Sequence, residues 1–82
     1  MPLFLGVHKF SPGMTEVETK EKYEKYKASA REDGLNPISA VYSAEKGFAY
    51  CQTEADSPEQ VRAAHEKVNI PLEDVMEIVK LD

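Results

Sequence analysis

The chain lacks the covalent devices that stabilise many small proteins. Its 82 residues include a single cysteine, so no disulfide can form within the chain. This length predicts one domain, residues 1–82. A domain of this size buries only about 60–65 % of the surface that its unfolded chain exposes. Small domains commonly compensate with a disulfide, a metal or a partner subunit, and here the first of these is excluded.

Signals for export and membrane insertion are also missing. The first residues contain neither a basic region nor a small-residue cleavage site, which argues against a signal peptide. The apolar runs are a few residues long, far short of the about 20 residues that cross a bilayer. A lone cysteine suits a reducing compartment. Together these features predict a cytoplasmic protein.

Positive charge is scarce. Ten lysines and arginines face fifteen aspartates and glutamates, which gives a net charge of −5. Affinity for nucleic acid comes largely from neutralising phosphates, so this balance disfavours it. The lysines between residues 20 and 27 alternate with glutamates, as they do on a solvated helix face. We therefore expect neither a nucleic-acid nor a membrane partner.

Turn-forming residues divide the chain into six elements. Strands are expected over residues 3–10, 38–43, 47–53 and 74–81. Ser11-Pro12-Gly13 separates the first strand from a helix that Thr15 caps and that runs to about residue 33. Ser57 caps a second helix, which runs to about residue 68. Gly34 and Asn69 suit the left-handed conformation that ends many helices.

The resulting order, β-α-β-β-α-β, predicts an α+β fold of the ferredoxin-like type. Two right-handed crossovers joined by a central hairpin give a four-stranded antiparallel sheet. In this topology the first and third strands are central and the second and fourth lie at the edges. Both helices cover one face of the sheet, and the other face has no helix over it.

The first strand has two apolar rows, one on each face. The row that we expect to face the helices consists of Leu3, Leu5 and Val7. The row that we expect on the open face consists of Phe4, His8 and Phe10. The last strand is also apolar on both sides. An uncovered aromatic face is a surface for a partner, so we predict a homodimer through it. The alternative to a dimer is an amphipathic sheet face that stays exposed to solvent.

Three residues have the chemistry to bind a metal, namely His8, Cys51 and His65. Imidazole and thiolate are ligands for late first-row divalent ions in general. Each residue also has an ordinary structural explanation: Cys51 as a small buried hydrophobe, His65 as a core histidine bonded to a carbonyl, and His8 as an interface residue. Tyr42 and Tyr50 fit interface rings better than catalytic acids, and we predict no catalytic residue.

The alternation of side chains along the first strand determines whether His8 and His65 lie on the same side of the sheet. If Leu3 and its row face the helices, His8 lies on the opposite side of the sheet from His65. A metal would then sit under the second helix with Cys51 and His65, or His8 would build a separate site on the open face. The sequence leaves both arrangements open.

Three segments together resemble a known family. They are Phe-Leu-Gly-Val-His-Lys at 4–9, Ala-Tyr-Cys-Gln-Thr-Glu at 49–54, and Val-Arg-Ala-Ala-His-Glu-Lys-Val-Asn-Ile-Pro at 61–71. This pattern is similar to that of small bacterial proteins of unknown function, described in part as nickel-binding or nickel-responsive. The resemblance implies a dimeric ferredoxin-like fold. It matches Cys51 and His65 to the family's most recognisable positions, and His8 to a first-strand histidine of the nickel-binding members.

Two positions depart from the family pattern. Relatives that bind nickel have histidines where this chain has Lys9 and Ile70, and neither side chain can replace imidazole. Our leading hypothesis is a non-enzymatic, homodimeric protein that binds nickel or a similar metal. The alternative is a small-molecule sensor or small enzyme that uses Cys51 and His65 in a pocket. A plain interaction module is a third possibility.

Overall fold

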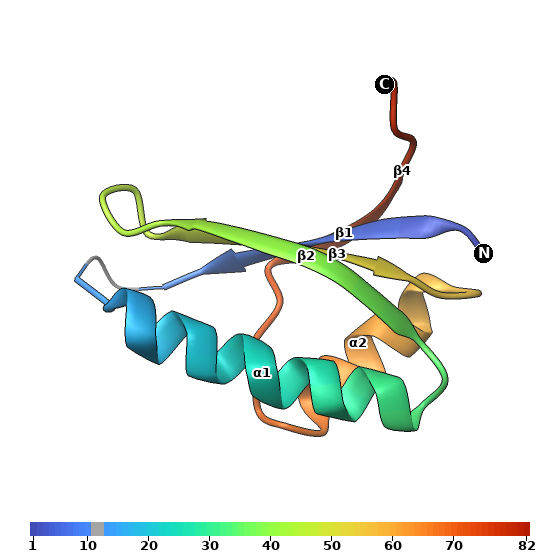
Figure 1. Cartoon of the computed structure of the whole chain (residues 1–82), viewed down its shortest axis with the longest axis horizontal. Helices are drawn as coiled ribbons and strands as arrows, with labels where there is room; N and C mark the ends of the chain where they lie inside the picture. The colour runs from blue at the N-terminus through green and yellow to red at the C-terminus, as the bar shows by residue number, and fades with distance from the viewer. Residues whose placement is uncertain (11–12) are drawn as a thin grey trace.

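The computed structural model describes residues 1–10 and 13–82, so Ser11 and Pro12 of the expected turn lie outside the described residues. Six elements follow one another: β1 (Leu3–Lys9), α1 (Glu16–Glu32), β2 (Asn36–Ser43), β3 (Phe48–Glu54), α2 (Pro58–Glu66) and β4 (Asp74–Ile78). The strands form one antiparallel sheet in the order β2-β3-β1-β4. Both helices lie on the same face of it (Figure 1). The predicted ferredoxin-like fold is confirmed.

The ends of the helices follow from their capping residues. The Thr15 side chain accepts from the backbone N–H of Glu18, and Ser57 does the same for Gln60, so both predicted caps are present, each as part of a capping box. Gly34 and Asn69 adopt positive φ angles of 80° and 58°, the left-handed exits expected from the sequence. The second helix ends at residue 66 and the last strand at residue 78, earlier than predicted.

The two faces of β1 are the reverse of the prediction. Phe4 is 3 % exposed and belongs to the core with Tyr26 and Val61, whereas the Leu3, Leu5 and Val7 row points away from the helices. The reason is a cross-strand contact: Gly6 lies opposite Cys51, and its missing side chain makes room for the cysteine sulfur. A glycine in the inner row lowered its hydrophobicity, so the pattern alone indicated the wrong face.

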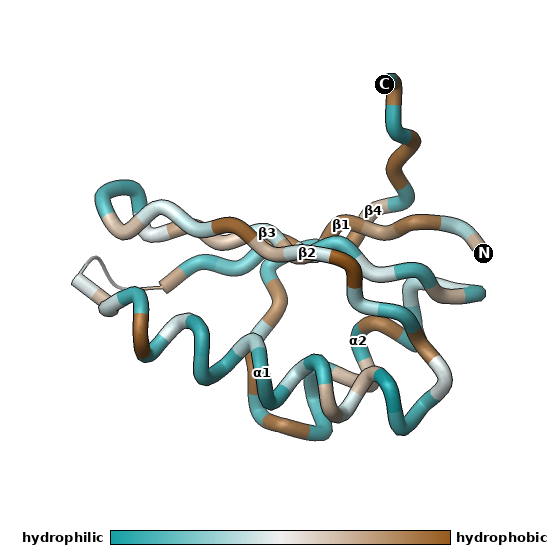
Figure 2. Tube along the Cα trace, in the orientation of Figure 1, coloured by the Kyte–Doolittle hydropathy of each residue, from teal (hydrophilic) through white to brown (hydrophobic). Residues whose placement is uncertain are grey.

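The open face is consequently aliphatic as well as aromatic. The register pairs Val7 with Tyr50 and Leu5 with Met76 across this face. Tyr50 is 38 % and Met76 41 % exposed. Apolar residues follow the strands and the C-terminal segment, whereas α1 is mostly hydrophilic (Figure 2). Val17 of α1 is also exposed.

The C-terminal segment leaves the sheet on the side away from the helices (Figure 1). Its residues Val79 and Leu81 are 77 % and 98 % exposed. In the described parts of the chain, neither helix has the length and apolar character that a membrane span requires.

Candidate metal centre

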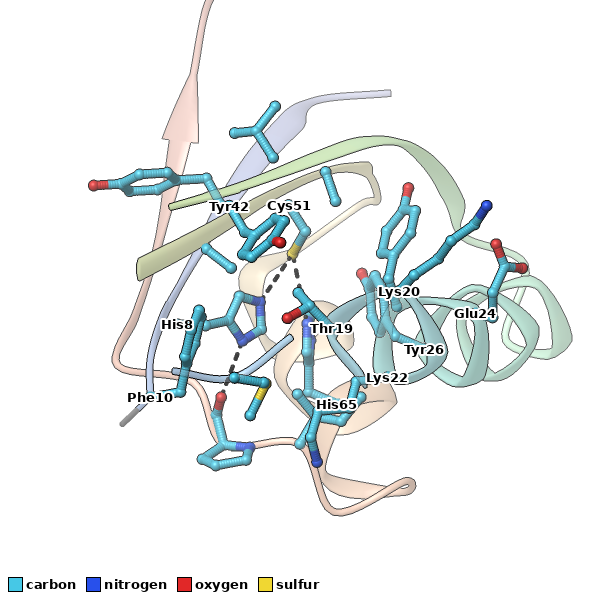
Figure 3. A pocket seen from close by; sticks show the side chains of 18 of the residues that line it. His8, Phe10, Thr19, Lys20, Lys22, Glu24, Tyr26, Tyr42, Cys51 and His65 are labelled. Atoms are coloured by element: carbon cyan, nitrogen blue, oxygen red, sulfur yellow. Dashed lines mark hydrogen bonds between the residues drawn. The ribbon is translucent and has the colours of Figure 1, made fainter. Parts of the chain in front are cut away.

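Three elements bring His8, Cys51 and His65 to one point between the sheet and the helices. Cys51 Sγ lies 3.4 Å from His8 Nε2 and 3.5 Å from His65 Nε2. One donor atom from each residue falls within 4.8 Å of the others. Both rings point toward the cysteine (Figure 3). The expected separation of the histidines was therefore wrong, because β1 presents its even-numbered side chains to the helices.

The outer nitrogens of the two rings are bonded to backbone carbonyls. His65 Nδ1 lies 2.7 Å from the carbonyl oxygen of Val61, one turn earlier in α2. His8 Nδ1 lies 3.1 Å from the carbonyl oxygen of Pro71. A carbonyl can only accept, so each Nδ1 carries the proton and donates it. Both Nε2 atoms then direct a lone pair at the cysteine, which is the tautomer that binds a metal.

The His65 ring is held in place from α1. The Tyr26 ring stacks on it with centroids 3.8 Å apart and an angle of 21° between planes. The Tyr26 hydroxyl lies 2.5 Å from Thr53 Oγ1 on β3. The Ser29 hydroxyl donates to the carbonyl of Ala64 at 2.9 Å, which joins the helices beside the ring. His65 is thus clamped between two helices and the sheet.

Gly6 controls the space around the thiol. A Cβ built on Gly6 would lie 2.7 Å from Cys51 Sγ and 3.1 Å from Leu72 Cδ2. Both distances are shorter than ordinary van der Waals separations of about 3.5–4.0 Å. Only glycine at this point of β1 lets the sulfur reach the two imidazoles.

Burial keeps the cluster uncharged at neutral pH. It lowers the pKa of His65 to about 4, against a weaker opposing effect of the Val61 hydrogen bond. Burial likewise lowers the pKa of His8, with the Pro71 hydrogen bond opposing it. The pKa of the Cys51 thiol rises to about 12 because of burial, although backbone hydrogen bonds oppose the rise. Two neutral imidazoles therefore face a protonated thiol.

The cluster borders a cavity of about 630 Å³ between the sheet and the N-terminal half of α1. Apolar and aromatic side chains line much of it, among them Phe10, Met14, Tyr23 and Tyr42. The rings of Phe10 and Tyr42 lie 6.5 Å apart. Tyr42 and Tyr50 both border the cavity, but Tyr50 pairs with Val7 on the open face of the sheet and is 38 % exposed.

Comparison with known proteins identifies the family of this chain. Residues 4–78 match the family described as nickel responsive protein, SCO4226-like. The chain belongs to this family. No curated protein matches it. Its fold is similar to that in the crystal structure analysis of SCO4226 from Streptomyces coelicolor A3(2), with a TM-score of 0.89 and 21 % sequence identity over 98 % of this chain and 99 % of that one. At this identity the likeness is one of fold.

The donor atoms fit the type of metal that the family description names. Two donors bonded to one ion at about 2.0–2.3 Å lie about 3–4 Å apart, which the two distances to Cys51 Sγ satisfy. Lone pairs of two neutral imidazoles and a sulfur form a donor set for late first-row ions. Lys9 and Ile70, where the family resemblance led us to expect histidines, line the cavity but add no donor to the cluster.

Sequence reasoning missed the residues that support the cluster. Neither Tyr26 nor Gly6 was among the candidate site residues. A glycine inside a strand often marks a close approach, so that signal was present. The carbonyls of Val61 and Pro71 leave no signal in the sequence, because any residue type supplies one.

Proposed function

We propose that this protein is a non-enzymatic, homodimeric binder of nickel, or of a similar late first-row divalent ion, and that His8, Cys51 and His65 are the ligands. The observation that carries the proposal is the convergence of two Nε2 lone pairs on one sulfur, with both outer nitrogens bonded to backbone carbonyls. Such outer hydrogen bonds typically orient metal-binding histidines. When bound, the metal would act as a charge centre that draws the three side chains together.

The acid–base properties of the cluster support a binding role over catalysis. A thiol with a pKa of about 12 is protonated at neutral pH and is a poor nucleophile. A histidine with a pKa of about 4 is a weak base. Neither group is tuned for proton or group transfer near pH 7. A metal changes this balance, because binding to it deprotonates a thiol.

The open face of the sheet supports the homodimer. Its most hydrophobic strand row, Leu3, Leu5 and Val7, lies on that face, beside Tyr50 and Met76. A sheet face of this kind is stable in water when another surface covers it. A second copy related by a two-fold axis offers the same aliphatic surface, and the exposed C-terminal segment projects on the same side. We place the dimer in the cytoplasm, where the free Cys51 thiol stays reduced.

Isothermal titration of the metal-free protein with Ni²⁺ tests the site. We expect binding in the parent and a loss of affinity of at least about tenfold in His8→Ala, Cys51→Ala and His65→Ala, since even outer-shell changes cost about 10–100-fold. Gln52→Ala is the matched control, because Gln52 neighbours Cys51 on β3 but points to the other face. Its affinity should equal that of the parent.

Two results would contradict the proposal. No binding in the parent would remove the function, and unchanged affinity in all three variants would remove these residues from the site. Parallel titrations with Co²⁺ and Zn²⁺ rank the ions, because residue types alone do not select among them.

The cavity favours one further candidate function, a sensor of small molecules that works without a metal. In that case Cys51 and His65 line the binding pocket, as both do here. A ligand that raises the melting temperature of the protein by the same amount with and without excess chelator would favour the sensor, because its binding would not need a metal.

A further inference from the structure

The three donors leave part of a metal's coordination unfilled. Late first-row ions take four or more ligands, whereas the cluster contains three residues among those that the structure describes, with no fourth histidine, cysteine or carboxylate. All three border the cavity. A further ligand to the ion would therefore come from whatever occupies that space.

The size and lining of the cavity indicate more than a water molecule. Its volume of about 630 Å³ lies within the range of about 300–1,000 Å³ that holds small organic ligands, whereas a water takes about 30 Å³. Phe10 and Tyr42 form a wall next to His8, and Tyr23 of α1 also lines the space. An occupant with an apolar body would bury surface against these rings.

Charge favours an anionic occupant. In a chain of net charge −5, the cavity is bordered by four lysines and two glutamates: Lys9, Lys20, Lys22, Lys27, Glu16 and Glu24. Lys27 pairs with Glu24 at 3.0 Å and Lys9 with Glu73 at 4.0 Å, which leaves Lys20, Lys22 and Glu16 outside the ion pairs of the described residues. A divalent ion held by one thiolate and two neutral imidazoles keeps one net positive charge. Positive charge therefore lies at both the inner end and the rim of the cavity.

From these observations we infer that the cavity binds a small apolar carboxylate, aromatic or aliphatic, whose carboxylate group completes the coordination of the metal. The inference rests on the proposed function, because it needs the metal at the cluster. It adds a ligand class: the ion and an organic acid are bound together, and the Phe10 and Tyr42 rings select the apolar body of the acid.

Cobalt-loaded protein provides the test, because the visible spectrum of Co²⁺ responds to a change of ligand. Phenylacetate carries the carboxylate and the apolar body, acetate only the carboxylate, and phenylacetamide the body without the charge. We expect phenylacetate to shift the cobalt bands with an affinity at least about tenfold above that of acetate, as burial of a phenyl ring predicts. Phenylacetamide should leave the bands unchanged.

Variants of the cavity lining test whether its rings cause the higher affinity for phenylacetate. Tyr42→Ala and Phe10→Ala should retain cobalt bands yet lose most of the advantage of phenylacetate over acetate. Val17→Ala, an exposed apolar residue of α1 outside this cavity, should behave as the parent. If water fills the cavity and no organic body binds there, phenylacetate and acetate will have the same affinity in the parent and in every variant.

Each contrary outcome has a distinct meaning. Absence of cobalt–thiolate absorption in the parent overturns the proposed function and this inference with it. Cobalt bands that respond equally to phenylacetate and acetate, or to neither, overturn the inference alone. A shift with 4-phenylimidazole but not with phenylacetate overturns the anionic class, because it shows that the cavity accepts an apolar body with a neutral donor.

Discussion

At the scale of single residues, each histidine ring of the cluster uses its two nitrogens differently. One nitrogen of each ring donates to a backbone carbonyl, Val61 for His65 and Pro71 for His8. The other nitrogen keeps its lone pair and faces Cys51 Sγ. Because the backbone selects these tautomers, little rearrangement is needed before an ion binds.

The first prediction concerns protons released when a metal binds. Near pH 7.5 the Cys51 thiol is protonated, with its pKa raised to about 12, and both imidazoles are neutral because their pKa values are lowered. Binding of Ni²⁺ should therefore release about one proton, from the thiol. Calorimetry in buffers of different ionisation enthalpy measures this number. Cys51→Ser should release none, and a release near zero in the parent would contradict a thiolate ligand.

The second prediction concerns stability in acid. The pKa of His65 is about 4 in the folded protein, against an ordinary value of 6.5 for an exposed histidine, so between these values the unfolded chain binds a proton that the folded chain does not. The free energy of unfolding should therefore fall as pH decreases through this window, by up to about 3 kcal/mol from this residue. Urea unfolding of metal-free protein at several pH values measures it.

The control for this effect is His65→Gln. The variant should be less stable at pH 7 but should lose less stability between pH 6.5 and pH 4. His8 adds to the loss in both proteins, since its pKa is also lowered. The difference between the two pH profiles therefore isolates His65, and identical profiles would show that its burial does not govern acid unfolding.

At the scale of elements, the cluster depends on how closely β1 and β3 approach. Gly6 and Cys51 are direct partners in the antiparallel pair, and the sulfur occupies the space where a Cβ of residue 6 would lie. The pairing of strands thus sets the position of the thiol. The length and capping of α2 then set the position of His65 relative to this thiol.

Gly6→Ala is the third prediction. The added methyl group forces Cys51 Sγ away from the two Nε2 atoms, so we expect lower affinity for Ni²⁺ and a loss of about 1–3 kcal/mol of stability from overpacking. Urea unfolding and calorimetry measure the two effects. In a Cys51→Ala background the same substitution should cost less stability, because the sulfur is gone. An equal cost in both backgrounds would place the clash elsewhere.

At the scale of the whole molecule, the two faces of the sheet present different groups. The covered face holds the cluster and the cavity, whereas the open face carries the aliphatic row of β1 with Tyr50 and Met76. A dimer through the open face leaves the cavity accessible. It also supplies the apolar burial that a domain of this size lacks by itself.

The fourth prediction is that the protein is a dimer at micromolar concentration. Tyr50→Lys places a charge in the centre of the proposed interface and should shift sedimentation equilibrium to the monomer. Val17→Lys, a matched change on the outward side of α1, should leave the dimer intact. If the parent sediments as a single chain at these concentrations, the open face has another role and the dimer proposal fails.

Local sequence signals were enough to predict the order of the elements, the capped starts of both helices and their left-handed exits. These signals act between residues a few positions apart, as between Thr15 and Glu18, so they can be read locally. The three candidate ligands could also be named, because few side chains bind late first-row metals. Each of these predictions depended on residue type and short-range spacing.

Which face of β1 is inside, and with it the convergence of His8 and His65 on Cys51, depended on the packing of the whole chain. The hydrophobic pattern indicated the opposite face. The inner row contains Gly6, which has no side chain, whereas the outer row consists of Leu3, Leu5 and Val7. The deciding contact joins Gly6 to Cys51, residues distant in sequence but adjacent across two strands. Steric fit between neighbouring strands, rather than hydrophobicity along one of them, placed the site.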